Sequence, residues 1–306
     1  MATPPHSPGA EPAPGYEVIE HLSRGRRLDV YDAWSRERGC RCILKTIRPE
    51  RSGEVRAREL LLEEGSLLER LTHPHLVRAY ETLLEPIPAI VMETLSGETL
   101  GHMIDSGREA TVADLGQLAL QLGSVIRYLH ANGVLHLDLK PSNIVAEAGR
   151  AKLIDLSVAR APGPAPAGVG TPDYMAPEQA RGEELGSAAD VWGVGVVLFE
   201  AATGQPAFEL EGTAGSASRT EANESWSEGG NDDPGDLGTG PDPDELYAQL
   251  EARAERLGGR PEIAPPLAEL VDDCLEPEPA RRPTVAGLLT RAERLAQVPA
   301  AQRRWS

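Results

Sequence analysis

Lysine is almost absent from this chain. Among its 306 residues only Lys45, Lys140 and Lys152 are lysines, and arginine supplies the other 27 of the 30 basic residues. Such a bias, together with abundant alanine, glycine and proline, is typical of a GC-rich bacterial genome. The 48 acidic residues bring the net charge to −18, so the chain lacks the basic face that phosphate backbones require. We therefore expect no nucleic-acid partner.

Cysteine and long apolar runs are also scarce. The three cysteines, Cys40, Cys42 and Cys274, are too few and too unevenly spaced for a disulfide framework. Cys40 and Cys42 lack a second pair at metal-ligand spacing, so we interpret them as ordinary strand residues. No signal-peptide pattern occurs, and no apolar run approaches the roughly twenty residues of a membrane span. The sequence thus predicts a soluble, cytoplasmic protein without a membrane partner.

Ordered structure is predicted for residues 16–295. Residues 1–15 are rich in proline and lack apolar periodicity, which predicts disorder, and residues 296–306 form a short tail. Between Glu209 and Glu245 the chain has 11 acidic residues and one basic residue. We interpret residues 212–243 as a disordered acidic insertion. Its serines and threonines are either sites of self-phosphorylation or, as the favoured interpretation, parts of a solvated loop.

Hydrophobic periodicity places the regular elements along the chain. Apolar alternation favours strands, and spacings of three and four residues favour helices. Thr111 and Asp114 have the spacing of a helix capping box. The predicted strands span 16–22, 29–35, 40–47, 77–84, 89–92, 143–146 and 151–155, and the main predicted helices span 55–71, 112–132, 244–257, 267–274 and 285–297.

The most informative stretch runs from His136 to Asn143, on a loop between a predicted helix and a predicted hairpin. Asp138 can accept a proton from an alcohol, and Lys140 can neutralise negative charge. Asn143 offers an amide oxygen to a hard cation. Asp155 would return beside it and supply a carboxylate for the same cation. A base, a cation and a pair of metal ligands suit phosphoryl transfer, where positioning and charge neutralisation supply most of the rate.

This stretch resembles the catalytic loop of eukaryotic-type (Hanks-type) serine/threonine protein kinases of bacterial, actinobacterial character. Asp155-Leu156-Ser157 is similar to the metal-binding motif of the same family. The resemblance covers residues 16–295. It implies a bilobal α+β fold, with a small β-rich lobe over 16–95 that carries one regulatory helix and a mostly helical lobe over 96–295. ATP and Mg²⁺ are expected between the lobes, with Asn143 and Asp155 as metal ligands and Lys140 beside the γ-phosphate.

The resemblance also implies a nucleotide-binding set. Lys45 stands where the family holds the α- and β-phosphates, and Glu64 stands where its partner carboxylate belongs. The neighbouring Glu63 is the alternative, but it lies about 100° around the helix. Gly25 is the one glycine kept of three in the phosphate loop, and Ile43 replaces a small alanine above the adenine. The residues implied to contact nucleotide are Gly25, Val30, Ile43, Lys45, Met92, Glu93, Leu95 and Val145.

The activation segment departs from the family pattern. From Val158 to Gly170 the chain contains no serine, threonine or tyrosine. Leu137 replaces the arginine that receives an activating phosphate in the family. We infer that any switch does not use phosphorylation of this segment. Immediately after it, Thr171 is implied to bridge the side chains of Asp138 and Lys140.

Three further residues have structural roles implied by the resemblance. Glu178 is expected to form a buried ion pair with the distant Arg282. Asp190, at the start of a predicted central helix, is expected to brace the backbone of the catalytic loop. A buried ion pair that loses one partner is strongly destabilising, so both members should tolerate little change.

The leading hypothesis is a serine/threonine protein kinase that transfers the γ-phosphate of ATP to protein hydroxyls, with Asp138 as catalytic base. The protein substrate is not identified, and self-phosphorylation is one option. The alternative is a pseudokinase that binds nucleotide or a partner with little catalysis. The missing glycines, Ile43 and Ser157 support it. A small-molecule phosphotransferase is disfavoured, because the segment from Thr171 to Glu178 resembles kinases of protein substrates.

Overall fold

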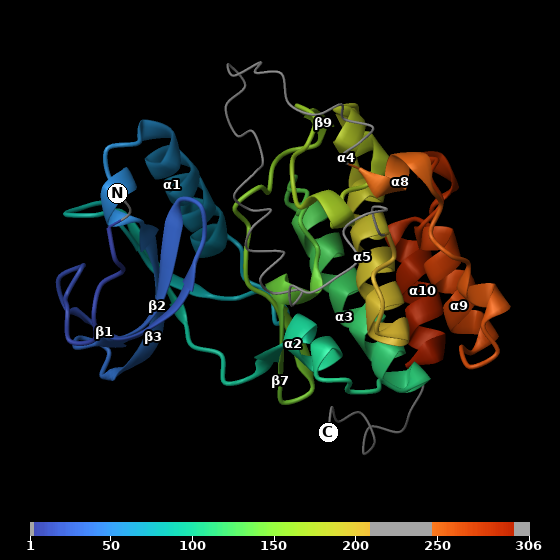
Figure 1. Ribbon diagram of the computed structural model, residues 1–306, viewed down its shortest axis with the longest axis horizontal. Helices are drawn as coiled ribbons and strands as arrows, with labels where there is room; N and C mark the ends of the chain where they lie inside the picture. Colours follow the sequence, from blue (N-terminus) through green and yellow to red (C-terminus); the bar gives the residue numbers. More distant parts are fainter. Residues whose placement is uncertain (1–2, 209–246, 297–306) are drawn as a thin grey trace. The chain divides into compact units, whose positions relative to one another are not determined.

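The computed structural model describes residues 3–208 and 247–296. The chain divides into two compact units (Figure 1). The first unit comprises Met1–Ser96 with Asp155–Ser157, and the second comprises Gly97–Ile154 with Val158–Ser306. An antiparallel sheet dominates the first unit and helices dominate the second, which confirms the α+β class. The acidic insertion predicted over 212–243 and the tail from 297 onward lie outside the described residues.

The sheet of the first unit has five antiparallel strands in the order β1-β2-β3-β5-β4. Tyr31, Leu44, Ile90 and Val91 are fully buried between its strands and the elements that cover them. Such burial of β-branched, aromatic and leucine side chains accounts for the stability of this sheet. The strands are β1 (Tyr16–Arg24), β2 (Leu28–Ser35), β3 (Cys40–Ile47), β4 (Ala79–Leu83) and β5 (Ala89–Glu93), and the 3₁₀ turn η1 (Pro49–Arg51) follows β3.

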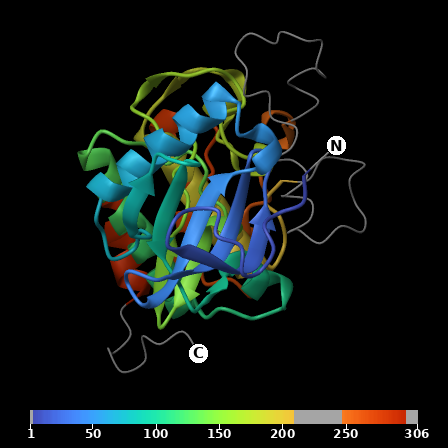
Figure 2. The same ribbon diagram turned by 90° about the vertical axis from the view of Figure 1, so that its left-hand side faces the viewer.

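Helix α1 (Val55–Arg70) lies across the sheet of this unit (Figure 2). Ala57, Leu61, Glu64 and Leu68 are buried at spacings of three and four residues, which places them on one face of the helix. That face contacts β3, β4 and β5. Glu64 is the one charged residue on it, so the sequence puts a carboxylate into an otherwise apolar contact.

The N-terminal segment corrects the prediction of disorder. Residues 3–15 run beside β1, where Gly9 donates its N–H to Val18 O and Val18 donates to Ala10 O, both at 2.8 Å. Ala13 is only 1% exposed and joins the apolar core of the sheet. Prolines do not prevent this arrangement, because an added edge segment needs few backbone donors and a small alanine fits the space.

The second unit is mainly helical and carries one small sheet in the order β6-β7-β8 and one pair, β9 with β10. Its described elements are β6 (Glu98–Thr99), α2 (Leu100–Asp105), α3 (Val112–Ala131), η2 (Pro141–Asn143), β7 (Ile144–Glu147), β8 (Arg150–Leu153), β9 (Gly163–Pro164), η3 (Pro172–Tyr174), α4 (Pro177–Arg181), β10 (Glu184–Leu185), α5 (Ser187–Thr203), α8 (Ala248–Glu251), η4 (Leu257–Gly259), α9 (Pro265–Cys274), η5 (Pro279–Arg281) and α10 (Val285–Leu295).

Helices α3, α5, α9 and α10 pack together in this unit (Figure 1). Thr111 and Asp114 form the predicted capping box at the start of α3. On the opposite face of α3, Gly116 and Gly123 allow α10 to approach closely. A Cβ on Gly116 would lie 2.7 Å from the backbone nitrogen of Ala296.

The structure corrects one expectation about a helix. The helix predicted over 244–257 is wrong in extent, because only Ala248–Glu251 is helical and Ala252 ends it with an extended backbone. Residues 244–246 lie outside the described part of the chain. Within the described ranges, no helix is both long enough and apolar enough to cross a membrane.

Candidate active site

Three of the predicted residues meet in one ion-pair cluster in the first unit. Lys45 Nζ, from β3, donates to Glu64 Oε1 across 2.8 Å and lies 3.3 Å from Asp155 Oδ1. The side chains of Lys45 and Glu64 are 7% and 1% exposed. Glu63, the alternative partner, is exposed to solvent. The contact present in the structure is therefore the one expected for Glu64, and a single buried ammonium bridges two carboxylates.

Burial and charge act against each other in this cluster. Burial alone would lower the pKa of Lys45, but the charges of Asp155 and Glu64 outweigh it and raise that pKa above its ordinary value. Burial raises the pKa of Glu64 to about 7, against the opposing charge of Lys45 and with the added repulsion of Asp155. The second carboxylate oxygen, Glu64 Oε2, is buried and makes no hydrogen bond in the described structure. Glu64 therefore keeps its proton to a higher pH than a carboxyl group in water.

Glu64 also connects α1 with the Asp155-Leu156-Ser157 motif. The N–H of Leu156 donates to Glu64 Oε1 at 3.2 Å, and the N–H of Ser157 donates to Asp155 Oδ1 at 2.8 Å. Serine supplies the same backbone donor as the glycine usually found after this dipeptide. The substitution at Ser157 thus leaves the hydrogen bond that orients the Asp155 carboxylate in place.

The catalytic loop of the second unit holds a closed network of polar side chains. Thr171 Oγ1 donates to Asp138 Oδ1 at 2.6 Å and accepts from Lys140 Nζ at 2.7 Å. Lys140 Nζ also lies 3.3 Å from Asp138 Oδ2. Asn143 Nδ2 donates to Asp138 Oδ2 at 2.9 Å and to the Asp138 carbonyl at 3.0 Å. Both carboxylate oxygens of Asp138 are therefore oriented, and Thr171 bridges Asp138 and Lys140 as the resemblance implied.

The backbone ahead of Asp138 is held by Asp190, at the first turn of α5. Asp190 Oδ2 accepts from His136 N at 2.9 Å and from His130 Nε2 at 2.7 Å, while Oδ1 accepts from Leu137 N at 2.8 Å. Burial alone would raise the pKa of Asp190, but its hydrogen bonds and His130 hold it below the usual range. Leu137 has φ +64°, a conformation that non-glycine residues rarely adopt. The expected brace is thus present, and it fixes a strained residue next to Asp138.

A second buried contact supports the segment after Thr171. Arg282 donates to Glu178 through both terminal nitrogens, at 2.6 and 2.8 Å. The guanidinium also lies over the ring of Trp192, 4.9 Å from its centroid. The ion pair that the sequence predicts is therefore bidentate and buried.

The predicted phosphate loop is the tight β1–β2 hairpin. Gly25 donates its N–H to Leu28 O at 2.8 Å, and its carbonyl accepts from Arg48 Nη1 at 3.1 Å. Sequence reasoning overlooked a support beneath this hairpin. The buried Asp29 receives a bidentate pair from Arg24 at 2.8 and 2.9 Å. The signal was the proximity of Asp29 to three arginines, Arg24 at the end of β1 and Arg26 and Arg27 in the turn before β2.

The other predicted nucleotide contacts lie on strands of the two units. In the first unit, Val30 pairs in register with Lys45, and Ile43 pairs with Met92. Glu93 ends β5 and Leu95 follows it. Val145 lies on β7 of the second unit and is 7% exposed. The structure thus brings Val30, Ile43, Lys45 and Met92 together on neighbouring strands.

The donor set is chemically suited to magnesium. Asn143 turns its amide nitrogen to Asp138, which leaves the amide oxygen as the atom offered to a cation. Asp155 contributes a carboxylate. The described residues contain no group of three or more histidine, cysteine or acidic side chains that would hold a metal by itself. An amide oxygen and a carboxylate are each a ligand type that Mg²⁺ accepts beside phosphate oxygens.

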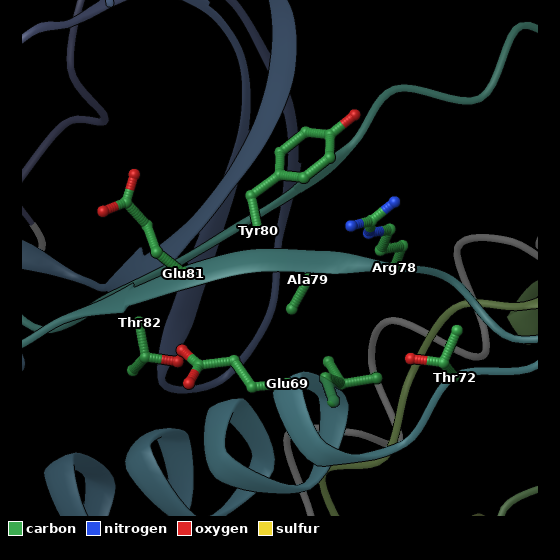
Figure 3. A pocket seen from close by; sticks show the side chains of 8 residues that line it. Glu69, Thr72, Arg78, Ala79, Tyr80, Glu81 and Thr82 are labelled. Carbon is green, nitrogen blue, oxygen red and sulfur yellow. The ribbon is translucent and has the colours of Figure 1, made fainter. Parts of the chain in front are cut away.

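The first unit also contains a cavity of about 510 Å³. Figure 3 shows Ala79, Thr82 and Glu69 between β4 and α1, with Tyr80 and Glu81 on the other side of the strand. The irregular register between Ala79 and Glu81 explains this break in alternation. None of the predicted site residues lines the cavity, so we assign it no part in the reaction.

Comparison with known proteins places these motifs in a family. The family model described as "Protein kinase domain" matches residues 16–292. Serine/threonine-protein kinase PkaA of Streptomyces coelicolor is 29% identical over 294 residues, which cover 89% of this chain and 48% of the relative. Serine/threonine-protein kinase PknB of Mycobacterium leprae is 30% identical over 220 residues, 68% of this chain and 35% of the relative. PknB of Mycobacterium tuberculosis is similar to the same extent, with 30% identity over 68% of this chain and 34% of the relative. The chain thus spans between a third and a half of these relatives, and it belongs to the protein kinase domain family.

Proposed function

We propose that this protein is a serine/threonine protein kinase that uses ATP and Mg²⁺. The observation that supports the proposal most directly is the hydrogen-bonded set of Asp138, Thr171 and Lys140. Lys140 two residues after the aspartate, and Thr171 bridging the two, match kinases that act on serine and threonine. The relatives that carry such kinase names are bacterial, and we extend a bacterial origin and a cytoplasmic location to this chain as part of the proposal.

The reaction follows from the chemistry of each group. The substrate hydroxyl oxygen forms a bond to the γ-phosphorus, the bond from that phosphorus to the β–γ bridging oxygen breaks, and ADP leaves. Asp138 orients the hydroxyl and takes its proton, while Lys140 steadies the γ-phosphate. Lys45, fixed by Glu64, holds the α- and β-phosphates. When bound, Mg²⁺ neutralises phosphate charge, and Asn143 and Asp155 would hold it.

A pseudokinase is the second candidate, and the β1–β2 hairpin favours it. Only Gly25 remains of the glycines that let backbone amides approach phosphates, and Ile43 narrows the space above the adenine. The polar groups of the site favour an active enzyme. A scaffold that had lost catalysis would have little reason to keep Lys45 and Asp138 in hydrogen-bonded, buried positions, so we favour the active enzyme.

The test is phosphate transfer from labelled ATP and magnesium by the purified chain beside Asp138→Asn. We expect incorporation into the chain itself or into a generic basic protein, and at least a hundredfold loss in the variant. Asp105→Asn, on the exposed end of α2, is the matched control and should keep the wild-type rate. Amino sugars and choline offered beside proteins would reveal a small-molecule phosphotransferase.

No incorporation by the wild type, together with stabilisation by ATP in a thermal-shift experiment, would establish the pseudokinase instead. If the wild type does incorporate phosphate, mass spectrometry of the incubated chain would show which hydroxyls carry it, including any in the acidic insertion.

A further inference from the structure

The activation segment is held in place although it has no hydroxyl that could be phosphorylated. Backbone contacts secure its first half. Arg160 exchanges two hydrogen bonds with Leu135, at 2.7 and 3.1 Å, and Gly163-Pro164 pairs with β10. The second half, residues 168–175, lies directly before and after Thr171, so its position sets the geometry around Asp138.

Gln179, on α4, holds this second half to the catalytic loop. Its side chain is buried with the residue 2% exposed. Its amide nitrogen donates to Leu137 O at 2.9 Å and to Val169 O at 2.8 Å, and its amide oxygen accepts from Ala176 N at 3.1 Å. Its own carbonyl accepts from Gly168 N at 3.1 Å. One glutamine thus satisfies the backbone of the catalytic loop and of the activation segment together.

The contacts of Gln179 close a ring around the catalytic pair. Leu137 is the residue before Asp138, and Val169 lies two residues before Thr171. The Thr171–Asp138 hydrogen bond and the contacts of Gln179 therefore join the same two segments, the catalytic loop and the activation segment, at neighbouring residues. Gly170 permits this approach, because its φ is +118° and a Cβ there would meet Leu137 O at 2.6 Å.

A second glutamine secures the far end of the segment. Gln249, on α8, is 4% exposed, and its amide nitrogen donates to Pro172 O at 2.8 Å and to Met175 O at 3.1 Å. In this way two neutral amides supply donors to four backbone carbonyls of the catalytic loop and the activation segment. A side-chain amide is neutral and is not switched by gain or loss of a charge, so these hydrogen bonds do not depend on phosphorylation.

We propose that Gln179 and Gln249 are positioning residues that hold residues 168–175 against the catalytic loop and so assemble the site without phosphorylation. This inference depends on the proposed kinase function and extends it. Leu137 lies where the family has a phosphate-binding arginine, and its backbone carbonyl accepts a hydrogen bond from Gln179. The segment is thereby fixed by glutamine amides where relatives with the arginine would use a phosphate.

The variant Gln179→Glu is the sharpest test, because it keeps the shape of the side chain and cannot make both donated hydrogen bonds, since a protonated carboxyl group has one donor and an ionised one has none. We expect kcat for peptide phosphorylation to fall about tenfold or more, with KM for ATP within about twofold. For Gln249→Leu we expect a rise in KM for peptide larger than the change in KM for ATP. Gln205→Leu, an exposed glutamine that accepts from Arg260, is the matched control. Wild-type protein freed of phosphate by a phosphatase should keep its full rate.

Hydrogen exchange of the amides in residues 168–175 is measured on the same proteins and does not depend on catalysis. Both glutamine variants should lose protection there, and the control should not. Unchanged protection, an unchanged kcat in Gln179→Glu, or a wild type silenced by phosphatase would each overturn the inference. An inactive wild type with the expected loss of protection in the variants would refute the proposed kinase function and leave the positioning by glutamine intact.

Discussion

Glu64 is a fully buried carboxyl group, and burial brings its pKa close to physiological pH. Its ordinary value of 4.5 is raised to about 7 by burial, and Lys45 offsets that effect only in part. The residue therefore titrates between pH 6 and 8, where most carboxylates remain ionised. Since Glu64 positions Lys45 and accepts from Leu156, protonation weakens the support of the phosphate-binding lysine.

We predict that kcat/KM for ATP falls about tenfold from pH 8 to pH 6 in the wild type, because a group with a pKa of about 7 loses most of its charge over that range. Stability should respond in the opposite direction. The folded state holds a proton on Glu64 that the unfolded state releases between pH 4.5 and 7, so this group's contribution to stability decreases as pH rises through that window.

Glu64→Gln removes the titrating group, so this variant tests both the predicted fall in activity at low pH and the predicted fall in stability at high pH. Its activity should be lower throughout, and its rate profile should lack the inflection near pH 7. Urea unfolding of the wild type and the variant at pH 5 and pH 7.5 measures how the free energy of unfolding depends on pH. An inflection that persists in the variant would assign the titration to a different residue.

At the scale of elements, the N-terminal segment was predicted wrongly. Its many prolines and lack of periodicity predict disorder, yet Thr3 O accepts from Arg24 at 2.8 Å and His6 N donates to Tyr31 at 3.1 Å. These contacts tie the segment to the hairpin that is expected to cover the phosphates. Long-range contacts of this kind leave no periodic trace in the sequence, which explains the error.

Ala13→Asp should therefore destabilise the first unit, because it places a charge where the side chain is 1% exposed. We expect the free energy of unfolding to fall by about 2–4 kcal/mol. Ser7→Asp, at an exposed position of the same segment, should change it by less than about 0.5 kcal/mol. Equal thermal midpoints for the two variants would show that residues 3–15 do not pack on the sheet in solution.

In helix α3, replacing Gly116 by alanine should destabilise the fold, although helix propensity alone predicts that alanine stabilises it. Alanine stabilises an exposed helix position by about 1 kcal/mol relative to glycine. At Gly116 the added Cβ would lie 2.6 Å from Leu295 Cβ and 2.7 Å from Ala296 N, and overpacking costs about 1–3 kcal/mol. Gly116→Ala should thus lower the unfolding free energy by up to about 2 kcal/mol. In Gly101→Ala, where the nearest atom is 3.5 Å away, urea unfolding should show no loss.

At the scale of the whole molecule, the sequence predicts the chemistry better than the supports beneath it. The contacts among Lys45, Glu64 and Asp155, and among Asp138, Lys140 and Thr171, match the predicted motifs because charged groups at fixed spacings are visible in a sequence. The roles of Gln179 and Gln249 are not visible in the sequence, because no characteristic residue spacing marks a glutamine that donates to backbone carbonyls. The boundaries of α8 were also missed, since only tertiary packing decides where so short a helix ends.

The two units carry different parts of the proposed reaction, and their cooperation can be measured. Lys45→Met should lower kcat/KM by about 10²–10³, and Asp138→Asn by about 10²–10⁴. If both residues serve the same transfer of one phosphate, their effects are not independent, and the double variant should be about as slow as the slower single variant. Lys152→Met removes the third lysine of the chain and is the control for lost charge, with an expected rate close to the wild type. Losses that multiply in the double variant would mean that the two residues contribute separately, and a single catalytic assembly would then be the wrong description.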